Sequence, residues 1–305
     1  MKVSGFFIVR HGEKFDYPYL ESLRSVLPLV DELVINVGIG EDATLARIQE
    51  LAGSEGEGKI QIFESHWPLD DPEKRRGGKI LSEQTNLALE RCTGDWCIYI
   101  QADEILHEED YPSLKQAMQR GLERDDVDGL LFDYRHLYGS YDVIQDSRSA
   151  YRREVRAIKK RSGARSVGDA QSFRLADGSK PRVIRAGARI FHYGWVRTPE
   201  AMRQKTAFMD TLYHGVGVGV GVGAGSDTPF TGANYRYKRF WGLRRFTETH
   251  PAVISERIRL KNWNWDLENS PWVLGRKDLT KIPLDLFEKL TGIRLFEYRP
   301  YRLLD

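Results

Sequence analysis

The sequence is poor in cysteine and has no long apolar segment. Only 2 of its 305 residues are cysteines, Cys92 and Cys97. Two are too few for the disulfide scaffold of a small secreted domain, and they have no partners at a spacing typical of a metal site. No stretch approaches the roughly 20 apolar residues that cross a bilayer. The opening segment, MKVSGFFIVRHGEK, contains an apolar patch too short for a secretory signal. We therefore expect a reduced, cytoplasmic protein.

A large excess of charge of one sign is also missing. The 46 Lys and Arg residues nearly balance the 44 Asp and Glu residues, which leaves a net charge of +2. This balance gives no reason to expect nucleic acid as a partner. With 41% hydrophobic and 30% charged residues, the composition is that of a globular chain. A chain of 305 residues suits one large domain, alone or with a substantial appendage.

Strand-like and helix-like segments alternate through the first part of the chain. Apolar runs typical of buried strands lie at 5–9, 32–38, 59–65 and 95–101, and helical apolar spacing lies at 17–30, 44–53 and 79–92. This alternation predicts a mostly parallel sheet covered by helices on both faces. Ligands bind such sheets at the carboxyl ends of the strands, where Arg10, Asp42, His66 and Asp103 are expected.

The strand at 95–101 runs directly into acidic residues, in the stretch GDWCIYIQADEIL. A carboxylate at a strand end suits a hard divalent cation such as Mg²⁺ or Mn²⁺, which takes ligands from one or two carboxylates and from phosphates. Asp103 is the candidate ligand. Alternatively, Asp103 and Glu104 only cap the following turn.

Several longer stretches resemble the family 2 glycosyltransferases of the GT-A fold. DELVINVGIGEDAT (31–44) is similar to the family's second strand and the loop after it, and QADE matches its Asp-X-Asp motif, with Gln101 and Asp103 at the two aspartates. The stretches similar to bacterial members are SYDVIQDSRSAYRREVR, DAQSFR, FHYGWVRTPEAM and THPAVISERI. The resemblance implies a GT-A nucleotide-sugar-binding and catalytic domain over residues 1–197. Such a domain is an α/β fold whose mostly parallel nucleotide-binding sheet is flanked by helices.

The same resemblance implies roles for two more residues. His192, in RIFHYGWVR, is similar to the histidine that serves as a second metal ligand beside Asp103. Asp169, in VGDAQSFR, lies in the region from which inverting members supply the base that deprotonates the acceptor hydroxyl. On the residues alone, His192 is equally a satisfied core histidine and Asp169 a plain turn residue.

The nucleotide site departs from the family pattern. Members usually carry an aspartate near Val37 to bind the base, and Asn36 or Asp42 is the candidate to replace it. Gln101 can hydrogen-bond a ribose hydroxyl but brings no charge to the metal. RRGGK (75–79) can approach a diphosphate, or it is a solvated loop. The residues we predict to hold the donor are Arg10, Asn36, Asp42, Lys79, Asn86 and Gln101.

RHGE at 10–13 also matches the start of the histidine phosphatases, in which the histidine is the nucleophile and the arginine binds phosphate. That activity needs a second histidine and further arginines, and the continuation after the motif does not match. We therefore interpret the RHGE match as a coincidence and do not expect His11 to be a nucleophile. A histidine phosphatase and an inactive sugar-nucleotide-binding protein, the latter suggested by Gln101 and Val37, stay as alternatives.

The character of the chain changes after residue 197. Residues 198–305 are expected to form a mainly helical extension that shapes the acceptor side, with a loop at the Gly-Val run 215–225. NYRYKRFWGLRRF (234–246) suggests contact with an anionic membrane surface or an acidic acceptor, or a helix packed on the core.

The sequence therefore predicts an inverting, metal-dependent hexosyl- or related transferase. Its donor is a nucleotide sugar and its cofactor Mn²⁺ or Mg²⁺. Its acceptor is a hydroxyl of a glycan or a lipid-linked molecule, in surface glycan synthesis. Peripheral association with the inner face of the membrane is a further expectation.

Overall fold

The computed structural model describes residues 1–214, 235–276 and 278–304. Its strands are β1 Val3–Val9, β2 Glu32–Gly38, β3 Ile60–Ser65, β4 Trp96–Tyr99, β5 Glu104–Leu106, β6 Gly129–Tyr138, β7 Ser140–Gln145, β8 Arg153–Lys159, β9 Arg165–Val167, β10 Ser172–Arg174, β11 Arg182–Trp195, β12 Leu243–Arg245 and β13 Arg302–Leu303. Its α-helices are α1 Tyr19–Val26, α2 Thr44–Ser54, α3 Pro72–Arg75, α4 Lys79–Arg91, α5 Tyr111–Leu122, α6 Pro199–His214, α7 Ser255–Arg259 and α8 Asp278–Thr291. Short 3-10 helices are η1 Leu27–Leu29, η2 Arg76–Gly78, η3 Glu108–Asp110, η4 Lys160–Ser162 and η5 Ala252–Ile254.

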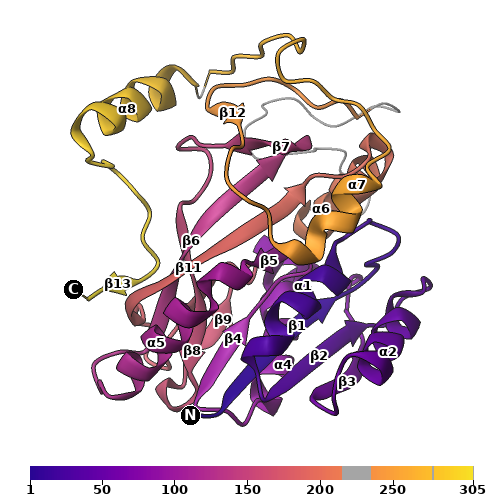
Figure 1. Ribbon diagram of the computed structural model, residues 1–305, viewed down its shortest axis with the longest axis vertical. Helices are drawn as coiled ribbons and strands as arrows, with labels where there is room; N and C mark the ends of the chain where they lie inside the picture. The colour runs from indigo at the N-terminus through magenta and orange to yellow at the C-terminus, as the bar shows by residue number, and fades with distance from the viewer. Residues whose placement is uncertain (215–234, 277, 305) are drawn as a thin grey trace.

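A large sheet forms the centre of the molecule (Figure 1). Within the described ranges it has 11 strands, along the path β12-β7-β6-β8-β4-β1-β2-β3, with β11, β5 and β13 joined through β6. Strands β4, β1, β2 and β3 run parallel to one another, and the pairs β6–β11 and β11–β13 are also parallel, whereas β4 pairs with β8 in the antiparallel sense. The predicted α/β fold, a large sheet flanked by helices, is confirmed.

Strands β1 and β2 are buried on both faces, which helices cover. Every residue of β1 and β2 is buried, as expected for strands in the middle of a parallel sheet. Adjacent residues of β1 point to opposite faces: Phe7 packs in the cluster that includes α1 and α2, and Phe6 packs in the cluster that includes α4. Helices α1, α2 and α4 alternate with strands β1 to β4 along the chain, as the sequence predicts.

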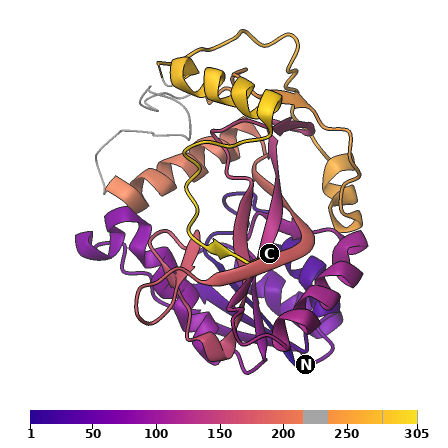
Figure 2. The ribbon, with the colours of Figure 1, turned by 90° about the vertical axis from the view of Figure 1, so that its left-hand side faces the viewer.

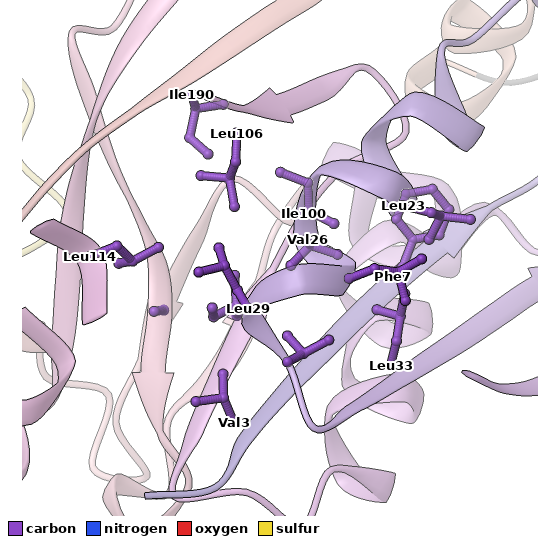
Figure 3. Packing of buried hydrophobic residues seen from close by; sticks show 14 of the residues in the cluster. Val3, Phe7, Leu23, Val26, Leu29, Leu33, Ile100, Leu106, Leu114 and Ile190 are labelled. Carbon is purple, nitrogen blue, oxygen red and sulfur yellow. The ribbon is translucent and has the colours of Figure 1, made fainter. Parts of the chain in front are cut away.

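Figure 3 shows the first of these clusters. Leu23 and Val26 of α1 lie one helical turn apart and pack with Phe7 of β1. Leu114 of α5 and Ile190 of β11 extend the cluster toward the second half of the sheet. One continuous core therefore joins the parallel strands β1, β2 and β4 to strands β6, β8 and β11 in the rest of the sheet.

In its described residues the C-terminal part adds the helices α6, α7 and α8 and the short strands β12 and β13. Helix α8 lies at the end of the molecule opposite the N-terminus (Figures 1 and 2). After α8 the chain returns to the sheet, where β13 pairs with β11. The predicted loop at 215–225 lies outside the described residues. None of the helices in the described ranges is long and apolar enough to cross a membrane.

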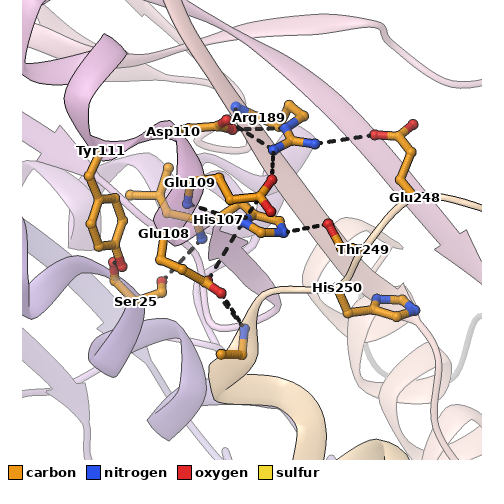
Figure 4. Close-up of polar contacts among 12 residues, drawn as sticks. Ser25, His107, Glu108, Glu109, Asp110, Tyr111, Arg189, Glu248, Thr249 and His250 are labelled. Carbon is orange, nitrogen blue, oxygen red and sulfur yellow. Dashed lines mark hydrogen bonds and ion pairs between the residues drawn. The ribbon is translucent and has the colours of Figure 1, made fainter.

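Side-chain hydrogen bonds fix the segment before α7 to the body of the sheet (Figure 4). The ring nitrogen Nε2 of His107 lies 3.1 Å from the hydroxyl of Thr249. The carboxylate of Glu108 accepts a hydrogen bond of 3.0 Å from the backbone N–H of Ala252. The stretch THPAVISERI, noted for its resemblance to bacterial glycosyltransferases, therefore attaches the C-terminal part to β5.

Candidate functional site

A cavity of about 430 Å³ lies at the carboxyl ends of β1 and β4, within the size range of roughly 300–1,000 Å³ typical of ligand sites. The sheet and the loops that follow its strands contribute polar lining, including Arg10, Tyr99, Gln101, Asp103, Arg156 and His192. Helix α6 closes one side with Lys205, Phe208, Met209, Leu212 and Tyr213. The cavity is therefore polar toward the sheet and partly apolar toward α6.

Asp103 is the charged centre of this cavity. Its Oδ2 atom lies 3.0 Å from Nζ of Lys205 and 4.0 Å from Nη2 of Arg197, and its Oδ1 atom lies 3.7 Å from Nε2 of His192. Burial alone would raise the pKa of Asp103, but the positive charges of Lys205 and Arg197 outweigh burial and hold that pKa well below its usual range. Asp103 is therefore ionised.

The tautomer of His192 follows from its partner. Nε2 of His136 lies 2.7 Å from the carbonyl oxygen of Tyr151 and must donate to it, while Nδ1 of His136 lies 3.1 Å from Nδ1 of His192. Burial, with a smaller effect of His192, lowers the pKa of His136 to about 3, so this ring is neutral and its Nδ1 accepts. His192, whose pKa burial lowers to about 4, then donates through Nδ1. Its Nε2 lone pair is left facing Asp103.

A glycine allows this approach of His192 and Asp103. A Cβ atom at Gly194 would lie 2.5 Å from Nε2 of His192 and 3.0 Å from Oδ2 of Asp103. Any side chain there would push the imidazole away from the carboxylate. The register of β11 against β6 also shifts between His192 and Trp195, and such bulges re-aim side chains. The glycine of HYGW, Gly194, is therefore needed for His192 to lie close to Asp103.

Glu104 faces a different environment from its neighbour Asp103. Its carboxylate is fully buried, accepts 2.8 Å and 2.7 Å hydrogen bonds from Arg156 and the Tyr134 hydroxyl, and receives the backbone N–H of Gln101 at 3.1 Å. A buried pair satisfied in this way holds the strand end in place. The Glu104 side chain therefore stabilises the fold and does not line the cavity.

Five of the residues predicted from the sequence line the cavity. They are Arg10, Gln101, Asp103, Asp169 and His192. The Nε atom of Arg10 donates to the carbonyl of Ile39 at 2.9 Å, and its buried Nη1 has no partner among the described residues. Asp169 accepts a 3.2 Å hydrogen bond from the Tyr213 hydroxyl of α6.

Four other predicted residues do not line the cavity. Asn36 is fully buried, and its amide donates to Gln84 of α4 at 3.0 Å. Asp42 accepts hydrogen bonds from the Lys14 backbone and the Thr44 hydroxyl at the start of α2.

Lys79 and Asn86 belong to α4, and their side chains serve other contacts. The exposed Lys79 lies 3.7 Å from Glu83, one helical turn on. Asn86 exchanges two hydrogen bonds with the backbone of Ser166, which joins α4 to β9.

The sequence did not predict Lys205, Arg197 or Arg156 as site residues. Burial, together with the nearby charge of Arg197, lowers the pKa of Lys205 to about 8, against the opposing charge of Asp103. Arg197 is fully buried beneath the site. The stretch HYGWVRTPEAM contains Arg197 and ends three residues before Lys205, but neither motif nor spacing links Lys205 to Asp103.

His11 takes no part in the cavity lining. Its ring packs edge-on against Phe15 and Phe208, with centroids 5.6 Å and 5.9 Å away. Burial, followed by the charge of Arg10, lowers the pKa of His11. These contacts are those of a packed ring beside the site.

No protein-family model and no curated protein matches this chain. Solved structures similar to it include S. aureus TarS 1–349 in complex with UDP-GlcNAc, at 20% identity over 46% of this chain and 36% of that chain, with a TM-score of 0.32. Glucosyl-3-phosphoglycerate synthase from Mycobacterium tuberculosis with Mg²⁺ and UDP has 19% identity over 44% of this chain and 43% of that chain, with a TM-score of 0.29. The mannosyltransferase PcManGT from Pyrobaculum calidifontis with GDP-Man and Mn²⁺ has 16% identity over 46% of this chain and 35% of that chain, with a TM-score of 0.30.

The matched part spans less than half the length of each of these three chains. Because their TM-scores are low, the fold class rests on the strand order described above.

Proposed function

We propose that the protein is an inverting glycosyltransferase that uses a divalent cation to move a sugar from a nucleotide-sugar donor to an acceptor hydroxyl. The observation that carries the proposal is the cavity at the carboxyl ends of β1 and β4, lined by Asp103, Asp169, His192 and Lys205. A glycan or a lipid-linked molecule is the proposed acceptor, and surface glycan synthesis the proposed setting.

The residues around Asp103 fit a divalent cation. Oδ1 of Asp103 and Nε2 of His192 both present lone pairs, 3.7 Å apart, and carboxylate oxygen and imidazole nitrogen are both ligands that Mn²⁺ accepts. Among the described residues no third His, Cys, Asp or Glu joins them, so donor phosphates and water would supply the other ligands. When bound, the cation would neutralise charge that develops on the leaving diphosphate.

Positively charged side chains add to this effect. Lys205 and Arg197 lie within 4.0 Å of Asp103 and give the cavity a positive potential once that carboxylate has another partner. The unpartnered Nη1 of Arg10 is a donor available to a phosphate or a ribose oxygen. Together these groups would bind the donor and orient its diphosphate.

Asp169 is the proposed general base. It is only partly buried, and its carboxylate accepts hydrogen bonds of 3.2–3.3 Å from Tyr213 and from the backbone of Gln171. It would take the proton of the acceptor hydroxyl while that oxygen bonds to the anomeric carbon and the bond to the diphosphate breaks. Attack from the opposite face inverts the anomeric centre.

Release of nucleoside diphosphate from UDP-, GDP- and dTDP-sugars with Mn²⁺ tests the proposal. Wild-type protein should turn over at least one donor. Asp103→Asn should lose Mn²⁺-dependent nucleotide binding, and Asp169→Asn should keep donor affinity while turnover falls about 10²–10⁴-fold. Asp177→Asn, in an exposed turn, is the matched control and should behave as wild type.

Other outcomes would favour the alternatives. Donor binding without turnover would indicate an inactive sugar-nucleotide-binding protein. Phosphatase activity that disappears in His11→Ala would indicate a histidine phosphatase. Normal metal-dependent binding by Asp103→Asn would contradict the proposed cation site.

A further inference from the structure

Exposed apolar side chains are concentrated in one short part of the chain. Of the 14 large hydrophobic residues that are exposed in the described part of the protein, 11 lie between Trp272 and Tyr298. Leu279, Leu290 and Phe296 expose 77%, 86% and 88% of their surface. Scattered exposed apolar residues are normal, but a gathering of this kind marks an interaction site.

Helix α8 presents its charged side to the rest of the protein, whereas an amphipathic helix usually packs by its apolar side. Asp285 is buried and accepts a 2.8 Å hydrogen bond from the indole N–H of Trp241. Glu288 forms ion pairs with Arg148 and Arg152 at 3.0 Å and 2.8 Å. These contacts hold the helix by its charged residues and leave Leu279, Leu286 and Leu290 exposed.

The exposed residues of the helix share one face. Leu279, Leu286, Phe287 and Leu290 follow the spacing of seven, one and three residues that places side chains on one side of a helix. Ile293, Leu295 and Phe296 continue the exposed surface beyond the helix end. We call these seven residues the apolar face of α8.

The exposed charges of the segment that carries the apolar face have one sign, although Lys289 lies 3.7 Å from Asp285 and Arg299 donates to Glu297 at 2.8 Å. Over 272–299 the exposed charged residues in the described part are Arg276, Lys289 and Arg299. The acidic residues of the same segment are buried or half-buried, and they are Asp278, Asp285, Glu288 and Glu297. Leucine and phenylalanine beside exposed basic residues are typical of helices that lie in the interface of an anionic membrane.

We propose that the apolar face of α8 binds the surface of a bilayer that contains anionic lipid. A second copy of this chain suits the surface less well, because a two-fold contact would bring the same basic residues toward one another. In a bilayer interface the apolar side chains enter the acyl boundary, and Arg276, Lys289 and Arg299 contact the headgroups.

The same helix touches the rim of the catalytic cavity. Nζ of Lys281, on α8, donates a 3.0 Å hydrogen bond to the hydroxyl of Ser149, which lines the cavity. Arg148 and Arg152, in the same loop, hold Glu288. A bilayer bound by α8 would therefore lie near the cavity. On the proposed function, this arrangement selects an acceptor hydroxyl carried by a lipid rather than by a free glycan.

Sedimentation of the full chain with phosphatidylcholine vesicles, with and without phosphatidylglycerol, tests the proposal. Wild type should bind the anionic vesicles and not the neutral ones. The double variant Leu290→Glu/Phe296→Glu should bind about tenfold less or weaker still, and Lys289→Gln should bind about fivefold less at low salt. Leu260→Glu is the control, because Leu260 is 64% exposed but outside the apolar face. It should bind as wild type does.

Thermal unfolding of each variant verifies that it is folded, and no side chain changed in these variants is buried. Absence of wild-type binding to anionic vesicles, or equal binding by the double variant, would overturn the proposal. So would a dimer in light scattering that Leu290→Glu dissociates, because a second copy would then be the occupant. The assay needs no sugar donor, so its result does not depend on whether the protein is a glycosyltransferase.

Discussion

Without a ligand, the ammonium group of Lys205 is the positive charge that lies closest to the Asp103 carboxylate. This group lies 3.0 Å from Oδ2 of Asp103 and 2.8 Å from the carbonyl oxygen of Gly194. Because the same carboxylate is the proposed cation ligand, ammonium and cation compete for it. A nucleoside diphosphate would give the ammonium a second anion to bind. Lys205 should therefore oppose binding of the cation alone and support binding of the nucleotide.

Lys205→Met removes the charge and keeps the length of the side chain. We expect Mn²⁺ alone to bind about tenfold more tightly, and UDP or GDP to bind about tenfold more weakly, because one positive charge close to both ligands is lost. Titrations with Mn²⁺ and with nucleotide, each followed by calorimetry, measure the two effects separately. Lys79→Met removes an exposed lysine outside the cavity and should change neither affinity. If both ligands weakened alike in Lys205→Met, the lysine would only support the fold.

Glu154 of β8 has a buried carboxyl group whose pKa is affected by Arg156. It is 2% exposed, accepts a 3.0 Å hydrogen bond from Gln171, and has an Oε2 atom without a partner in the described part of the chain. Burial raises its pKa to about 8, against the opposing effects of Arg156 and Gln171. Glu154 is thus protonated in the folded protein near neutral pH and ionised in the unfolded chain.

This raised pKa makes stability depend on pH. The favourable contribution of protonated Glu154 is complete below the unfolded pKa of 4.5 and is lost as pH rises toward 8. The loss is at most about 1.4 kcal/mol per pH unit. Glu154→Gln should lack it, so the free energy of unfolding of the variant relative to wild type should increase from pH 5 to 8. Urea unfolding at several pH values measures this, with the exposed Glu123→Gln as control. A constant difference across that range would show that Glu154 is already ionised in the fold.

At the scale of elements, local pattern predicted the first hundred residues well. Strands β1 to β4 and helices α1, α2 and α4 lie within two residues of the expected bounds at most ends. Parallel strands buried on both faces and amphipathic helices each impose a periodicity that neighbouring residues reveal. The predicted strand at 95–101 is shorter in the structure because β4 ends at Tyr99. The chain then turns so that Asp103 can enter the cavity.

Site residues were predictable where the backbone alone places them. Asp103 follows a strand end and lines the cavity. His192 lines it too, but the family resemblance suggested that residue, and local pattern did not. Asn36 also sits at a strand end, but the pleat turns its side chain toward Gln84 of α4. Lys205 was missed because α6 must pack across the sheet before it meets Asp103, 102 residues earlier in the chain. Contacts of that kind depend on tertiary packing, which local spacing does not encode.

At the scale of the molecule, the C-terminal part is built into the same body as the sheet. Ile254 of η5 is fully buried against Ile105, Leu137 and Phe191, which belong to β5, β6 and β11. The hydrogen bonds from His107 and Glu108 hold the same segment. An extension fixed in this way should unfold together with the sheet rather than before it.

Ile254→Ala tests whether the C-terminal part and the sheet unfold together, because it creates a cavity where the two pack against each other. We expect a loss of about 2–5 kcal/mol in the free energy of unfolding, as for other buried isoleucines. The transition should stay single, with the same midpoint by circular dichroism and by tryptophan fluorescence. Four of the 7 tryptophans, from Trp241 to Trp272, lie in the C-terminal part, so fluorescence weights that part, whereas circular dichroism reports the whole chain. Leu260→Ala, at an exposed leucine, should leave the midpoint unchanged. An earlier fluorescence transition in Ile254→Ala would mean that the extension unfolds as a unit of its own.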